Sequence, residues 1–130
     1  MKLKSLGVIF LILTTLLFAG CRTAPVYNIS DAAFPEQGAT ESDIARAIVT
    51  AGGSLGWVMK KKEPGHIIGT LRIRDHIAVV DIAYDDEKYS ITYNDSTNLK
   101  YDGTVIHSNY NSWITNLSNA ISNQVSMLNM

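Results

Sequence analysis

The clearest catalytic spacing in the chain is Gly52-Gly53-Ser54-Leu55-Gly56, where a serine stands between glycines as in the nucleophile turn of α/β-hydrolases. In that turn the serine follows a strand and precedes a helix. Here a helical pattern ends at the glycines and a strand-like pattern follows, so the order is reversed. Glycines that end a helix explain the segment better than a nucleophile does.

The titratable side chains form no other catalytic or metal-binding pattern. His66, His76 and His107 are the only histidines, and none has a second histidine or a cysteine at metal-ligand spacing. The acidic run 85–87 lacks the pattern of a calcium loop and reads as a solvated turn. We therefore expect a protein that is not an enzyme and that uses no metal or cofactor.

A segment from residue 93 to residue 113 mixes aromatic rings with amides and carboxylates. Sugars stack on such rings and hydrogen-bond to amides, and partner proteins use aromatic residues as anchors. The same residue types also build turns, caps and strands, so a purely structural role stays open. The candidate binding surface consists of Tyr93, Asn94, Asp95, Asn98, Tyr101, Asp102, His107 and Asn111.

The single cysteine of the chain, Cys21, follows an unusual N-terminal segment. Lys2 and Lys4 precede an uncharged, mostly apolar stretch over residues 6–19, and two small residues then precede the cysteine. Fourteen residues of helix rise about 21 Å, which is short of the roughly 30 Å of a hydrocarbon core. A transmembrane helix fits poorly for that reason, whereas an ordinary cleaved signal peptide fits the charge and length.

The segment also resembles the signal peptide and lipobox of bacterial lipoproteins, although Phe18 stands where the lipobox prefers leucine. This resemblance implies a signal peptide over residues 1–20 and a diacylglyceryl thioether on Cys21, with fatty-acyl chains such as palmitate holding the protein to a membrane. Arg22, in place of an aspartate, implies sorting to the outer membrane by enterobacterial rules. The folded part would then lie in the periplasm.

Charge argues against nucleic acid as a partner. The full chain has 11 basic and 12 acidic residues, and removal of Lys2 and Lys4 with the signal peptide leaves 9 against 12, a net charge of −3. Such a chain lacks the basic footprint of a nucleic-acid-binding domain. We interpret its only basic run, residues 60–62, as a solvated strand end beside a turn rather than as a phosphate or phospholipid site.

The processed chain divides into a tether and one domain. Residues 21–39 carry Pro25, Pro35 and Gly38 without a clear period, which predicts a lipidated tether, although residues 26–29 can still dock on the domain. Residues 40–130 predict a single α+β domain.

The domain should begin with a helix over residues 40–55, because apolar residues recur there at helical spacing and Thr40 with Asp43 resembles a capping box. Period-two patterns between short turns predict a four-stranded antiparallel meander. A loop over residues 95–106 and a helix over residues 107–128 complete the domain. We expect both helices on one face of the sheet. The expected strands cover residues 57–62, 67–74, 77–84 and 89–94.

The stretch from residue 57 to residue 113 resembles a family of small proteobacterial outer-membrane lipoproteins. The resemblance implies an outer-membrane lipoprotein with a small α+β domain, and it points to no particular activity. The helix and meander layout is also similar to small domains in accessory lipoproteins of outer-membrane assembly machinery. The motifs that carry the family resemblance are Gly56-Trp57-Val58, Glu63-Pro64-Gly65, Tyr84-Asp85, Tyr101-Asp102-Gly103 and Tyr110-Asn111 with Trp113.

These observations predict a lipid-anchored, non-enzymatic envelope protein. It would bind or assist other envelope components at the periplasmic face of the outer membrane. The alternative is a module that binds peptidoglycan or another glycan through Tyr93, Asn98 and Tyr101.

Overall fold

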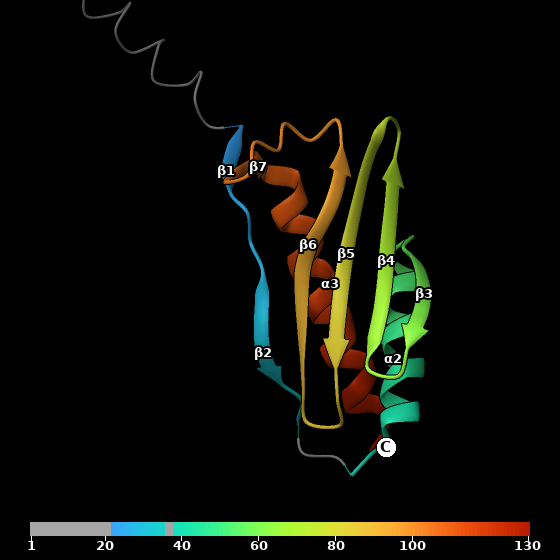
Figure 1. The fold of residues 1–130 in the computed structure, drawn as a ribbon. Coiled ribbons are helices and arrows are strands. Elements are labelled where there is room, and N and C mark those ends of the chain that lie inside the picture. The colour runs from blue at the N-terminus through green and yellow to red at the C-terminus, as the bar shows by residue number, and fades with distance from the viewer. Residues whose placement is uncertain (1–21, 36–37) are drawn as a thin grey trace, which may run out of the picture.

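A computed structural model describes residues 22–35 and 38–130. The predicted signal peptide and Cys21 lie outside these residues. The described chain has an α+β fold (Figure 1). Its elements are β1 (Thr23–Pro25), β2 (Ile29–Ala33), α2 (Glu41–Ser54), β3 (Val58–Glu63), β4 (His66–Ile73), β5 (His76–Tyr84), β6 (Lys88–Thr97), β7 (Val105–His107) and α3 (Ser108–Met127).

The main sheet has five antiparallel strands in the order β2-β6-β5-β4-β3. The predicted meander corresponds to β3 through β6, so the prediction of four strands was one strand short. A separate two-stranded sheet pairs β1 with β7. β7 takes up the last two residues of the predicted loop and the first residue of the predicted helix. The α+β class is therefore confirmed, with a correction to the sheet.

The extra strands β1 and β2 come from residues 21–39, where we expected a tether. β2 pairs with β6, with Ile29 opposite Ile91. Directly after β2, the buried ring of Phe34 stacks on Tyr89, with ring centroids 4.9 Å apart. Burial of these apolar side chains favours docking over a solvated chain. Most of the described part of the expected tether therefore belongs to the folded domain.

The core lies between the sheet and the two helices, which both lie behind the sheet in Figure 1. Alternate residues of β4, β5 and β6 are buried, as in a sheet with one covered face. α2 starts at the predicted capping box, since Thr40 and Asp43 hydrogen-bond to each other's backbone N–H groups. α3 contributes the fully buried residues Tyr110, Ile114, Leu117, Ile121 and Val125.

The lysine run 60–62 lies on β3, an edge strand of the main sheet. All three lysines are exposed. Charged side chains on an edge strand oppose pairing with other chains, which gives the run a structural role.

None of the helices in the described ranges combines the length and apolar character needed to cross a bilayer.

Candidate functional site

Five of the predicted binding residues lie together. Tyr93, Asn94, Asp95, Asn98 and Tyr101 line a surface hollow of about 330 Å³ at the end of β6 and in the loop that follows it. Ser96, Leu99 and Lys100 complete its wall. We call this feature, lined by residues 93–96 and 98–101, the tyrosine hollow. The sequence hypothesis therefore named a set of residues that the fold brings to one place.

The tyrosine hollow contains a stacked pair of rings. The centroids of Tyr93 and Tyr101 are 4.1 Å apart with an interplanar angle of 29°, and Tyr110 meets Tyr93 edge-on at 5.8 Å. The Tyr93 hydroxyl lies 2.7 Å from Oγ of Ser96. Tyr101 is 41% exposed, so one ring of the stack is open to a ligand.

Burial changes the acidity of the two phenols beneath this surface, Tyr93 and Tyr110. Burial raises the pKa of Tyr93 and raises the pKa of Tyr110 much further, because the phenolate form loses water. The Tyr110 hydroxyl is buried and has no hydrogen-bond partner in the described structure. These phenols stay protonated at neutral pH, so they offer rings and neutral hydroxyls rather than general bases.

The loop of the hollow is held in a fixed shape. Asn98 and Lys100 both have left-handed backbone conformations, with φ of 58° and 56°. The side-chain amide of Asn98 donates to the Asp75 carboxylate (2.7 Å), and the backbone carbonyl of Asn98 accepts from Nδ1 of His76 (2.8 Å). Leu99 between them is buried. The loop is thus fastened both to the core and to the turn between β4 and β5.

Asp102, His107 and Asn111 do not line this hollow. Asp102 accepts the backbone N–H groups of Val105 and Thr104, and these bonds lower the pKa of its carboxyl group. Nδ1 of His107 accepts the N–H of Asn109 and so caps the start of α3. Both side chains stabilise local structure, which is the alternative that the sequence left open.

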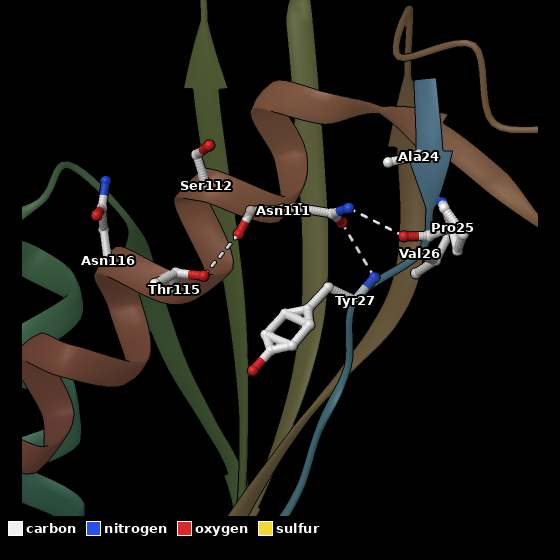
Figure 2. A pocket seen from close by; sticks show the side chains of 8 residues that line it. All are labelled: Ala24, Pro25, Val26, Tyr27, Asn111, Ser112, Thr115 and Asn116. Atoms are coloured by element: carbon white, nitrogen blue, oxygen red, sulfur yellow. Dashed lines mark hydrogen bonds between the residues drawn. The ribbon is translucent and has the colours of Figure 1, made fainter. Parts of the chain in front are cut away.

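Asn111 instead joins α3 to the end of β1 and to the chain that follows it. Its Oδ1 accepts the N–H of Tyr27 (3.0 Å), and its Nδ2 donates to the carbonyl of Pro25 (2.9 Å), as Figure 2 shows. One amide thus satisfies two backbone groups more than 80 positions away in sequence. This contact fixes one wall of a second and larger cavity.

That cavity, which we call the flank groove, has a volume of about 630 Å³. Ala24, Pro25, Val26 and Tyr27 form one wall, and Asn111, Ser112, Thr115 and Asn116 of α3 form the other (Figure 2). None of the lining residues is charged. Tyr27 is 43% exposed, and the Thr115 hydroxyl donates to the carbonyl of Asn111 (3.1 Å). The groove therefore offers an apolar wall facing hydroxyls and amides.

Of the residues that line the flank groove, only Asn111 was predicted from the sequence to be a candidate binding residue, and the groove itself was not predicted. The possible docking of residues 26–29 was its one signal. The polar residues of α3 gave no signal of a groove, because serine, threonine and asparagine are also common on an ordinary solvent-exposed helix face.

The other chemistry-bearing residues have structural partners. The Ser54 hydroxyl at the end of α2 donates to the carbonyl of Ala51 (2.7 Å), and a helix rather than a strand precedes it. Nε2 of His66 lies 2.8 Å from Oδ1 of Asp81. Across residues 22–35 and 38–130, no three histidine, cysteine or acidic side chains gather where they could hold a metal ion.

Comparisons of the chain with protein-family models, curated proteins and solved structures found no match.

Proposed function

We propose that this chain is a lipid-anchored, non-enzymatic envelope protein that binds other envelope components at the periplasmic face of the outer membrane. The observation that best supports binding is the flank groove, whose residues begin three positions after Cys21. A cavity of about 630 Å³ has the size of a small-ligand or peptide-anchor site.

The chemistry of the groove favours a protein segment as its ligand. The exposed ring of Tyr27 and the side chains of Pro25 and Val26 provide apolar contact area. Asn116 and Ser112 face them with donors and acceptors for a peptide backbone. The Asn111 bonds hold the wall in place before binding, and a wall that is already ordered lowers the entropy cost of association.

Photo-crosslinking in intact cells tests this function. A photoreactive residue at Tyr27 or Asn116 should capture the same partner, whereas the same residue at Thr92, on an exposed strand position outside both cavities, should not. No reproducible partner at either groove position, or equal capture at Thr92, would refute binding in the groove.

The anchor has its own test. Mass spectrometry of the protein isolated from membranes should find Cys21 as an acylated N-terminus. Cys21→Ser should abolish the acylation, because a serine hydroxyl cannot carry the thioether. An unmodified thiol in the membrane-derived protein would exclude the lipid anchor.

A glycan-binding module is the second candidate, and the stacked pair of Tyr93 and Tyr101 favours it. An exposed ring flanked by Asn94 and Asn98 is a suitable platform for a sugar. Purified peptidoglycan should then retain the protein, and Tyr101→Ala should abolish retention while Tyr27→Ala leaves it unchanged. Equal retention of Tyr101→Ala and the unaltered protein would exclude this site.

A further inference from the structure

Arg22 and β1 lie at one particular end of the domain. We call this the hairpin end and define it by the β4–β5 turn, residues 73–76, and the loop 98–104. The carbonyl of Arg22 accepts the N–H of Ser108 (3.0 Å), and the N–H of the adjacent His107 bonds to Leu99 in that loop (2.8 Å). Figure 1 shows β1, the loop and the β4–β5 turn at the same end.

The chain between the proposed anchor and the folded domain is very short. Only Arg22 separates Cys21 from the first residue of β1. Two residues of extended chain span about 7 Å. The tether of up to 19 residues that the sequence predicted would have let the domain move far from the membrane. With β1 and β2 folded, a lipid on Cys21 would hold β1 within about 10 Å of the bilayer. The charges of the hairpin end then decide which face of the domain turns toward the membrane.

Exposed cations mark this end. Arg22, Arg72, Arg74 and Lys100 are all exposed, and none forms an ion pair with another described residue. The nearby carboxylates of Asp75, Asp95 and Asp102 each accept a hydrogen bond from an N–H group of the protein.

The opposite end of the domain has a different character. It holds the start of α2, the β3–β4 turn and the β5–β6 turn. β4 runs from this end to the hairpin end and separates the two by about 24 Å. The hairpin end has four cations against three carboxylates, whereas the opposite end has six carboxylates beside Lys61, Lys62 and Lys88. The hairpin end is therefore the less acidic of the two and the one that suits an anionic surface. The carboxylates of the opposite end are Glu41, Asp43, Glu63, Asp85, Asp86 and Glu87.

We propose that the hairpin end lies directly on the bilayer, with Arg72, Arg74 and Lys100 among anionic phospholipid headgroups. Ile73 and Tyr101, which are 38% and 41% exposed, add apolar contact at the level of the headgroups. This placement rests on the proposed lipid anchor and adds a defined orientation to it. The flank groove then lies beside the bilayer, along β1 and the first turns of α3.

Hydrogen exchange of the acylated full-length mature protein tests the placement. The protein is reconstituted in vesicles of phosphatidylethanolamine with phosphatidylglycerol, in vesicles of phosphatidylcholine alone, and in neutral detergent micelles. Amides of residues 72–76 and 98–104 should exchange more slowly on the anionic vesicles than on either neutral surface. An arginine or lysine near an anionic membrane strengthens contact about fivefold. Arg72→Gln with Arg74→Gln should therefore lower this protection by up to about 25-fold.

The matched control is Lys60→Gln with Lys62→Gln, which removes two exposed cations from β3. It should leave the protection unchanged. Equal exchange of both segments on anionic vesicles and in micelles, with Cys21 acylated, would overturn the placement and leave the anchor intact. Protection confined to the flank groove or to β3 would also overturn it. An unmodified Cys21 would instead remove the anchor and the proposed function with it.

Discussion

The two hydrogen bonds of Asn111 give a prediction whose size follows from the structure. Asn111→Ala removes the acceptor for the N–H of Tyr27 and the donor to the carbonyl of Pro25. A typical protein hydrogen bond contributes about 1 kcal/mol net, so the loss is about 2 kcal/mol. Alanine is the better helix former by about 0.6 kcal/mol, which offsets part of it. We expect a net destabilisation of about 1.4 kcal/mol.

Asn116→Ala is the matched control. Asn116 lies on the same helix and is exposed, and its side chain has no hydrogen bond to any other described residue. Its replacement should stabilise the protein by about 0.6 kcal/mol through helix propensity alone. The two variants should differ by about 2 kcal/mol, or about 1.3 M in the urea midpoint at an m-value of about 1.5 kcal/mol/M.

Urea unfolding followed by circular dichroism measures this difference. Asn111→Asp adds a test of direction, because it keeps the acceptor for Tyr27 but sets a carboxylate oxygen against the carbonyl of Pro25. It should destabilise the protein although its side chain has almost the same size. If Asn111→Ala and Asn116→Ala shift the midpoint equally, the Asn111 bonds do not hold the groove wall.

Two further predictions concern the domain itself. A Cβ at Gly52 would lie 2.5 Å from Sδ of Met59, whereas a Cβ at Gly53 would meet nothing within 4 Å. The flexible side chain of Met59 must move to admit this Cβ, so Gly52→Ala should destabilise the protein by about 1 kcal/mol, the low end for overpacking. Gly53→Ala should stabilise it by about 0.5–1 kcal/mol, and melting temperatures that move in the same direction would contradict this. Bonds from Val105 and Thr104 depress the pKa of Asp102, so the stability that its carboxylate contributes is fully present above the ordinary value of 3.8. That stability is lost as the pH falls from 3.8 through the lowered pKa of the folded protein. The melting temperatures of the unaltered protein and Asp102→Asn should thus differ at pH 7 and approach each other only as the pH falls well below 3.8; a constant offset would refute the role of these bonds.

The sequence predicted the elements whose periodicity is carried by many residues. α2 and α3 fall within one residue of the expected limits, and the strands of the meander follow the period-two pattern. β1 and β7 have only three residues each, which is too short for a period to be visible. Their pairing joins residues 80 to 84 positions apart, and only the tertiary fold brings them together.

In the candidate site, too, contacts between neighbours in sequence were predictable and contacts between distant residues were not. Tyr93 and Tyr101 lie close in sequence on a strand and its following loop, so their proximity was predictable from local structure. Asn111 belongs to α3, and its partners lie near the beginning of the chain. Asparagine types alone cannot show whether an amide faces a ligand, a turn or a distant backbone, because all three uses need the same donor and acceptor.

The two cavities lie on either side of the first turn of α3, and their positions bear on which candidate function is the better one. Tyr110 packs toward the tyrosine hollow, while the next residue, Asn111, lines the flank groove. The hollow belongs to the loop of the hairpin end, so our proposed placement turns it toward lipid headgroups. Cell-wall glycan would then reach Tyr101 poorly, whereas a membrane-bound partner could still enter the flank groove. An insert of about 20 flexible residues after Arg22 would free the domain from the surface. Under our placement this insert should improve peptidoglycan retention and weaken crosslinking at Tyr27.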